Sequence, residues 1–191
     1  MWYNFYININ SKKMKRKIIL NLAMSLDGYI AKKDGGFDWI KGDGDKSNDT
    51  EKQFSFPTFI ESLDMVVMGK RAFLDAPSGT MEMFKNQKVY VASNQKLDTE
   101  HNVEFISGDI VNQILELKKE KGKNIWLFGG AGSIDPFIKA DVIDEYIVGI
   151  IPIILGEGIP LFFENNPKLE LHLNESTVQE GVVILRFSKR K

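Results

Sequence analysis

The sequence predicts a single α/β domain of three layers, with a mostly parallel central sheet and antiparallel strands at its C-terminal edge. Strand-like and helix-like segments alternate over residues 18–139, which is the pattern of consecutive βαβ units. From residue 144 onward the segments are strand-like only, which is typical of antiparallel strands added to an open sheet. The 191 residues suit one well-buried core rather than two domains.

The first half of the chain contains four predicted strands. Residues 18–24 are apolar except for Asn21, as in a strand buried on both faces, and residues 29–31 resume an extended segment after a turn at Gly28. Short apolar runs at 65–68 and 88–92 predict two further buried strands. A helix is expected from residue 49, with Pro57 in a first turn and with Leu63 on its apolar side, and another helix begins at Lys70.

The second half continues the alternation and then changes. Residues 103–106 and 125–128 are predicted strands, and Asp109 is the expected N-cap of an amphipathic helix that ends at Lys121. A second helix is expected over residues 133–139. A β-rich stretch at 144–155 is interrupted by Pro152, and residues 169–173 and 182–187 alternate apolar with polar positions as an antiparallel pair does.

Composition excludes several classes of function. The 25 basic and 26 acidic side chains leave a net charge of −1, which disfavours nucleic acid and anionic membranes as partners. The chain has no cysteine, and its two histidines, His101 and His172, have no ligand-like spacing, so no metal site is expected. Residues 1–13 are treated as an N-terminal extension, either an added strand or a stretch upstream of a natural start at Met14. They do not resemble a signal peptide, and a cytoplasmic protein is expected.

A glycine-rich turn is the most informative feature. The predicted strand at 125–128 ends in Phe128 and runs directly into Gly129, Gly130, Ala131, Gly132 and Ser133, where a helix begins. Glycines allow a diphosphate to approach the main chain, and the first N–H groups of the helix are unpaired donors at the positive end of its dipole. A glycine turn that binds nothing is the alternative.

Two other predicted strands end in polar or basic residues. Gly69, Lys70, Arg71 and Ala72 follow one strand, and Ser93 and Asn94 follow the next. Ligands of open α/β sheets bind beyond the carboxyl ends of parallel strands, so the three segments together predict a dinucleotide site. A 2′-phosphate suits the guanidinium of Arg71 with Lys70 or Ser93 nearby, which favours NADPH over NADH. Taken singly, the basic pair could be a solvated helix start and Ser93-Asn94 an ordinary turn.

Several spaced motifs resemble one known family. Residues 23–31, 37–39 and 66–71, together with motifs at 129–133, 144–145, 152–156 and 160–162, occur in the order found in the dihydrofolate-reductase-like fold. The chain is most similar to the reductase domain of bifunctional riboflavin-biosynthesis deaminase/reductases and its stand-alone relatives. The resemblance covers about residues 14–191, which we treat as one reductase domain.

The resemblance implies an NADPH-dependent reductase that forms a homodimer. It places the nicotinamide over the first strand and its turn, near Ala23 and Ile30. Phosphate contacts are then expected from Gly69 to Ala72, Ser93, Asn94 and the turn at 129–133. The expected substrate is a small heteroaromatic, pteridine-like or riboflavin-precursor-like molecule. The alternative is a non-catalytic dimeric module that binds a nucleotide or ligand on the same fold, and a kinase-like phosphate-binding domain is disfavoured because no Lys follows the glycines.

Reduction of a C=N or C=O bond also needs a proton, and two carboxylates are candidate donors. Asp38 lies between Phe37 and Trp39, which could sandwich a flat heterocycle and desolvate the acid, or could simply close the core. Asp27 is the second candidate, although it is equally suited to capping N–H groups of its own turn. Phe56 and Phe59 are expected to complete the wall of the substrate pocket.

Overall fold

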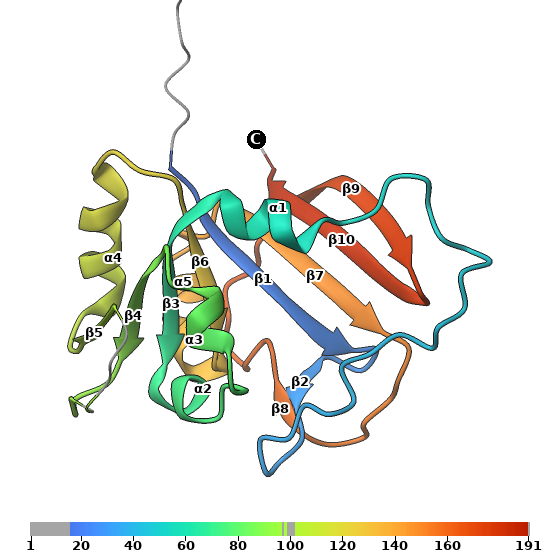
Figure 1. Cartoon of the computed structure of the whole chain (residues 1–191), viewed down its shortest axis with the longest axis horizontal. Helices are drawn as coiled ribbons and strands as arrows, with labels where there is room; N and C mark the ends of the chain where they lie inside the picture. The colour runs from blue at the N-terminus through green and yellow to red at the C-terminus, as the bar shows by residue number, and fades with distance from the viewer. Residues whose placement is uncertain (1–15, 97, 99–101, 191) are drawn as a thin grey trace, which may run out of the picture.

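Six parallel strands form the body of an eight-stranded sheet in the computed structural model, which describes residues 16–96, 98 and 102–190 (Figure 1). Two antiparallel pairings, β7 with β10 and β10 with β9, complete one edge. The predicted mostly parallel sheet with antiparallel C-terminal edge strands is therefore confirmed. Across the sheet the order is β5 (Val103–Ile106), β4 (Lys88–Ala92), β3 (Leu63–Gly69), β6 (Asn124–Gly129), β1 (Ile18–Ser25), β7 (Glu145–Ile151), β10 (Val182–Lys189) and β9 (Leu171–Gln179).

The central strands are buried on both faces because helices cover each side. In β1, Ile18 and Leu20 belong to one apolar cluster, whereas Ile19 between them belongs to the other. Strands β3 and β6 divide their side chains in the same way. Continuous apolar runs are what such doubly covered parallel strands require, and this explains why the sequence pattern located them.

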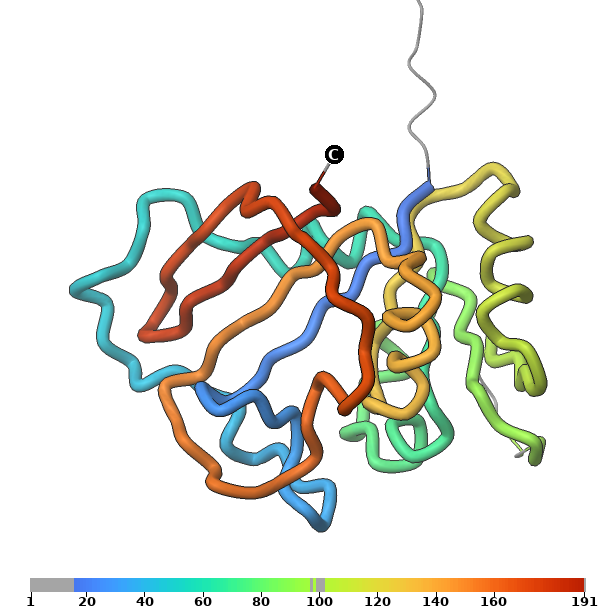
Figure 2. Tube along the Cα trace, turned by 180° about the vertical axis from the view of Figure 1, so that it is seen from behind, coloured from blue at the N-terminus to red at the C-terminus, as the bar shows by residue number. Residues whose placement is uncertain are grey.

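Helices form the two outer layers. On one face lie α1 (Phe56–Glu61), α2 (Lys70–Leu74) and α3 (Thr80–Met83), whose apolar residues join the cluster around Trp126. The opposite face carries α4 (Ile110–Lys119) and α5 (Ala131–Lys139), and α5 is seen in front of the sheet in Figure 2. Phe137 of α5 is completely buried in this second cluster. The predicted three layers are present.

Several predicted elements have different bounds. The helix expected from residue 49 begins only at Phe56, because Ser55 is its N-cap and Pro57 occupies the first turn. Leu63 is not in that helix but is the first residue of β3. α3 and the short β8 (Ile159–Pro160), which pairs with β2 (Tyr29–Ala31), were not predicted. These elements have too few residues to show a periodic pattern.

The parallel strands β3 and β6 are neighbours in the sheet, but the helices that follow them lie on opposite faces. α2 leaves the end of β3 on one face, and α5 leaves the end of the adjacent β6 on the other. Such a switch point opens a crevice at the carboxyl ends of the two strands, which is where ligands of open α/β sheets bind. Gly69 and Gly129 are the last residues of these strands.

Residues 1–13, the predicted extension, lie outside the described residues. Among the helices described here, none has the length and apolar character needed to cross a bilayer.

Candidate functional site

Three predicted binding segments meet at one edge of the sheet. The strand register sets Gly69 of β3 opposite Ala92 of β4, and Met68 of β3 opposite Gly129 of β6. The segments that follow β3, β4 and β6 are therefore neighbours. A side-chain contact joins two of them, because Lys70 Nζ donates to Gln95 Oε1 at 2.5 Å. The structure thus brings together loops that are far apart in the sequence.

The glycine turn has the geometry of an open helix N-terminus. Gly130 is the N-cap of α5 and has φ of 79°, in the left-handed region that glycine adopts without strain. Ser133 Oγ donates to the carbonyl oxygens of Gly129 and Gly130 at 2.7 and 2.8 Å, so this hydroxyl fastens the turn. The N–H groups of Ala131 and Gly132 lie in the first turn of α5, where no intrahelical acceptor exists.

The space next to two glycines of this turn is open. A Cβ built on Gly132 would meet no atom within 4 Å, and one built on Gly129 would meet only the Ala72 methyl, at 3.9 Å. A Cβ built on Gly130 would lie 3.8 Å from the Cα atom of Gly69. Side chains at these glycines would fill the crevice, so the sequence keeps two N–H donors and the floor of the crevice bare.

The basic pair after β3 is partly engaged by protein groups. Arg71 Nη2 donates to the carbonyl oxygen of Asp34, and Arg71 Nε contacts Asp75 Oδ2 at 3.2 Å. The Arg71 side chain still has 59% of its surface exposed, so a face of the guanidinium is open to a ligand. Ser93 Oγ donates to the carbonyl oxygen of Gln95 and accepts from its N–H group, which is the turn-forming role considered above.

An apolar cavity of about 360 Å³ lies over β1, on the face that carries α1. Strands β1, β6, β7 and β10 all contribute to its wall, together with Phe54 and Phe56 at the start of α1. Ala23, the predicted nicotinamide neighbour, lines it, and so does Phe56. The cavity is lined by Asn21, Leu22, Ala23, Ile40, Lys41, Gly42, Phe54, Phe56, Trp126, Gly149, Ile151, Gln179, Glu180, Val182 and Ile184.

Two apolar side chains at the cavity are unusually exposed. Ile40 and Phe56 each expose about 41% of their surface. The segment before Phe56 is tied to the β9–β10 hairpin, because Asp49 Oδ1 accepts from Glu180 N at 2.7 Å and Thr50 N donates to Val178 O at 3.0 Å. Apolar groups held at a cavity mouth are typical of a ligand site.

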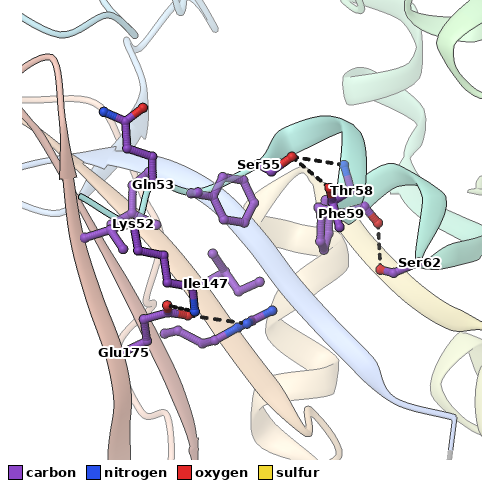
Figure 3. Close-up of a pocket in the computed structure, with 12 residues that line it drawn as sticks. Lys52, Gln53, Ser55, Thr58, Phe59, Ser62, Ile147 and Glu175 are labelled. Atoms are coloured by element: carbon purple, nitrogen blue, oxygen red, sulfur yellow. Dashed lines mark hydrogen bonds and ion pairs between the residues drawn. The ribbon is translucent and has the colours of Figure 1, made fainter. Parts of the chain in front are cut away.

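A smaller, polar cleft of about 250 Å³ adjoins the cavity and shares Phe54 and Ile184 with it. Figure 3 shows Lys52 reaching down from the loop before α1 to Glu175, while the hydroxyl groups of Ser55 and Thr58 lie together at the start of α1, away from this pair. Lys52 Nζ lies 2.5 Å from Glu175 Oε1. That lysine holds the pKa of Glu175 below its usual range. Arg186, the other cation of the cleft, pairs with Glu145 at 2.6 Å and with Glu175 at 3.5 Å, so both cations already have carboxylate partners.

Asp27 is a structural carboxylate here. Its Oδ1 accepts from Ser25 Oγ at 2.6 Å and from Leu155 N at 3.1 Å, and its Oδ2 accepts from Gly156 N at 2.8 Å. The Ser25 hydroxyl is the main cause of a lowered pKa for Asp27. A carboxylate with a lowered pKa is ionised at neutral pH, so these surroundings are unfavourable for the predicted proton donor.

The predicted desolvation of Asp38 is wrong. Its side chain is 75% exposed and pairs with Lys32 Nζ at 2.7 Å, and this contact lowers the pKa of Asp38. Phe37 is 40% exposed, whereas Trp39 is buried and donates its indole N–H to Gly36 O at 3.3 Å. Neither aromatic lines the cavity or the cleft, although Ile40, the residue after Trp39, lines the cavity.

The remaining predicted residues divide between the site and the core. Phe59 is buried against Trp126 and lines the polar cleft rather than the cavity. Phe128 stacks edge-on with Trp126 at 4.9 Å between ring centroids. Ile30 packs against the core cluster on the α5 face, so it does not share the cavity wall with Ala23. Asn94 lies in the loop after β4, at the edge that carries the glycine turn.

Sequence reasoning missed most of the cavity wall. Phe54, Trp126, Gly149 and the β10 side chains come from distant segments whose meeting depends on the sheet order. One signal was present, because Asn21 is the single polar residue in the apolar run of β1. Within the described residues, no group of three or more His, Asp or Glu side chains is arranged to hold a metal ion.

Comparison with known proteins agrees with this architecture. Residues 16–185 match the family described as RibD C-terminal domain. YwjB, an uncharacterized protein of Bacillus subtilis (strain 168), is 39% identical over 177 residues, which cover 90% of this chain and 96% of YwjB. A putative riboflavin biosynthesis protein from Shewanella sp. PV-4 has a similar structure, with a TM-score of 0.76 and 28% identity over 92% of this chain and 99% of that one.

The fold extends to a more distant relative. Dihydrofolate reductase from Enterococcus faecalis, solved in complex with NADP(H), superposes with a TM-score of 0.61 and 14% identity, over 93% of this chain and 98% of that chain. The dihydrofolate-reductase-like fold and the resemblance drawn from the motifs are thus both confirmed. The chain belongs to the family of RibD C-terminal domains.

Proposed function

We propose that this protein is an NADPH-dependent reductase of a small heteroaromatic compound. The observation that carries the proposal is the open turn at the end of β6, where three glycines and the N–H groups of Ala131 and Gly132 lie next to the end of β3. Membership of the RibD C-terminal domain family supports it. So does the NADP(H) bound by the structurally similar dihydrofolate reductase.

Within this proposal the diphosphate of the cofactor is held by the N–H groups of Ala131 and Gly132 at the positive end of α5. Lys70 and the open face of Arg71 bind the 2′-phosphate, and Ser93 and Asn94 close the same edge. When bound, the cofactor supplies a hydride from its nicotinamide ring. The position of Ala23 in the cavity floor lets the ring approach β1 closely, because a methyl group occupies little space.

The substrate occupies the apolar cavity next to Ala23. A volume of about 360 Å³ suits one or two fused rings, and Phe54, Phe56 and Trp126 provide flat surfaces for them. The class is pteridine-like or riboflavin-precursor-like, in keeping with the putative riboflavin biosynthesis protein named above. The proton comes from water at the cavity mouth, because neither Asp27 nor Asp38 lines the cavity and both have lowered pKa values.

The test is a titration of the pure protein with NADPH and with NADH, followed by nicotinamide fluorescence and by thermal shift. Saturable binding with preference for NADPH is expected. A second assay follows NADPH consumption with a panel of pterins, imines and aldehydes. No response at about millimolar cofactor, the weak end of the specific-binding range, would remove the cofactor from the proposal.

A non-catalytic binding module is the second candidate function. The observation that favours it is the state of the two candidate acids, since Asp27 caps a loop and Asp38 faces solvent. The two functions differ in one result. A reductase consumes NADPH with at least one member of the panel, whereas the module binds NADPH and consumes none.

We also propose that the protein acts as a homodimer in the cytoplasm. Exposed apolar side chains on β9 and β10 support pairing through that edge, among them Leu173 with 48% and Val183 with 37% of its surface exposed. Sedimentation equilibrium gives the expected mass of two chains. Replacement of Leu173 by Lys should shift that mass toward one chain.

A further inference from the structure

We propose that residues 41–53 act as a strap that gates the apolar cavity, closed against the turn of the β9–β10 hairpin and opening without the rest of the fold. The strap contains no helix or strand, and long loops of this kind are typical of lids over ligand sites. The inference rests on the proposed function only in taking the cavity as ligand space, and it adds the step by which a ligand enters and leaves.

The two ends of the strap are anchored in the protein, and its middle is not. Trp39, two residues before the strap, is buried, and Phe54, directly after it, packs against Phe59 with 5.9 Å between ring centroids. Between these anchors every residue is glycine or polar. No apolar side chain therefore holds the strap in place, and its position depends on polar contacts alone.

Those contacts converge on the turn of the hairpin, and Figure 1 shows the strap running around the end of β9 and β10. Gly44 N donates to Glu180 O at 3.3 Å, and Asp49 Oδ1 accepts from Glu180 N at 2.7 Å. Thr50 N donates to Val178 O at 3.0 Å, and Thr50 Oγ1 accepts from Val178 N at 3.1 Å. The strap thus binds the turn from two sides.

Two glycines allow the strap to lie directly against the turn. A Cβ built on Gly42 would overlap the carbonyl oxygen of Glu180, and one built on Gly181 would overlap Asp43 Oδ1. Gly42 is not among the glycines with positive φ, so the close contact requires this glycine and the backbone conformation does not. Any side chain at residue 42 would displace the strap from the turn.

The contact between strap and turn is also part of the cavity wall. Lys41 and Gly42 of the strap line the cavity together with Gln179 and Glu180 of the turn. Separation of the strap from the turn therefore widens the mouth of the cavity. Contacts between exposed polar groups are individually weak, whereas β10 is hydrogen-bonded to a strand on each side, so the strap opens before the sheet does.

Amide hydrogen exchange measures this opening without any ligand. The N–H groups of Val178 and Glu180 donate to the strap, so they exchange when the strap opens. In the wild type both should exchange at least about 10-fold faster than the protected amides of β10. Equal protection of the two sets would overturn the inference, because the strap would then open only when the whole protein unfolds.

Four variants test which contacts hold the strap closed. Gly42→Ala displaces the strap from the turn, and Asp49→Ala removes the acceptor of Glu180 N. Each should speed exchange of the Val178 amide at least about 10-fold, and this amide is the one to read because its own acceptor, on Thr50, is unchanged. Asp49→Asn keeps an acceptor oxygen and should restore slow exchange. Gly36→Ala, in the turn after β2, is the matched control and should leave exchange unchanged.

Thiol labelling connects the opening of the strap to the cavity. The chain has no cysteine, so Ala23→Cys places a single thiol in the cavity wall. Addition of Gly42→Ala should raise the rate of its reaction with N-ethylmaleimide about 10-fold, and addition of Gly36→Ala should not change it. The same rate in all three proteins would overturn the inference. Neither measurement contains NADPH, so a protein that binds no NADPH would lose the proposed function while these results still judge the strap.

Discussion

Substitutions at Gly132 separate the stability of the fold from the binding of the cofactor. Gly132 is the second helical residue of α5, and a Cβ added there meets no atom within 4 Å. Alanine is a better helix former than glycine by about 1 kcal/mol, so Gly132→Ala should raise the melting temperature by about 2–4 °C. Gly132→Val should leave it nearly unchanged, because valine loses most of that gain to side-chain entropy.

The same substitutions should weaken the binding of NADPH. The isopropyl group that Gly132→Val introduces would occupy the space in which the diphosphate meets the N–H groups of Ala131 and of residue 132 itself. Hydrogen bonds to a charged group contribute about 1.5–3 kcal/mol each, so the loss of two weakens NADPH binding by at least about 100-fold. Alanine should have a smaller effect. Gly130 is a poorer choice for this test, because its φ of 79° would strain any other residue and destabilise the turn.

The assay is fluorescence titration with NADPH, with thermal unfolding measured on the same samples. The control is Val111→Gly, which alters the corresponding position of α4 and lies away from the crevice. It should lower the melting temperature and leave the dissociation constant unchanged. Wild-type affinity in a folded Gly132→Val protein would refute the reasoning, since the diphosphate would then lie elsewhere.

Three further changes test other parts of the structure. Arg71→Gln should weaken NADPH binding about 10-fold and leave NADH binding unchanged, and Lys119→Gln is the control. Equal losses for both cofactors would argue against a contact between Arg71 and the 2′-phosphate. Asp27→Asn should make the loop at Leu155 and Gly156 more sensitive to proteolysis at neutral pH. Because the folded pKa of Asp27 is lowered, its contribution to stability is full above the ordinary value of 3.8 and decreases as pH falls through the lowered value. The variant should therefore lose less stability than the wild type as the pH falls below 3.8. Asp144→Ala removes the carboxylate that accepts from Ile18 N at 2.8 Å and pairs with Lys118. It should lower the free energy of unfolding by about 2 kcal/mol, measured as a fall of about 4–8 °C in melting temperature. An unchanged melting temperature would mean that water replaces the carboxylate.

Much of the fold could be predicted because parallel strands buried on both faces are continuous apolar runs. The strands around Leu20, Val67 and Leu127 were located in this way, and the antiparallel edge followed from the change of pattern after residue 144. The helix start was placed too early, because the polar residues 49–53 carry no helical period and belong to the loop. The N-cap Ser55 and Pro57 set the real start.

The edge that carries the glycine turn could be predicted, and the cavity could not. Glycines and basic residues directly after strands are local signals, and the rule that parallel strands end at one edge brings them together. The cavity combines β1, β6, β7, β10 and the loop before α1, so its wall depends on sheet order and on register. Aromatic neighbours in the sequence do not predict burial, because Asp38 lies between Phe37 and Trp39 and its side chain is still exposed.

The most direct test of the central claim is a crystal structure of the protein with NADPH. The account predicts diphosphate oxygens within hydrogen-bond distance of the Ala131 and Gly132 N–H groups, and the nicotinamide beside Ala23 in the apolar cavity. A nucleotide bound on another face, or a crevice left empty at saturating NADPH, would contradict it.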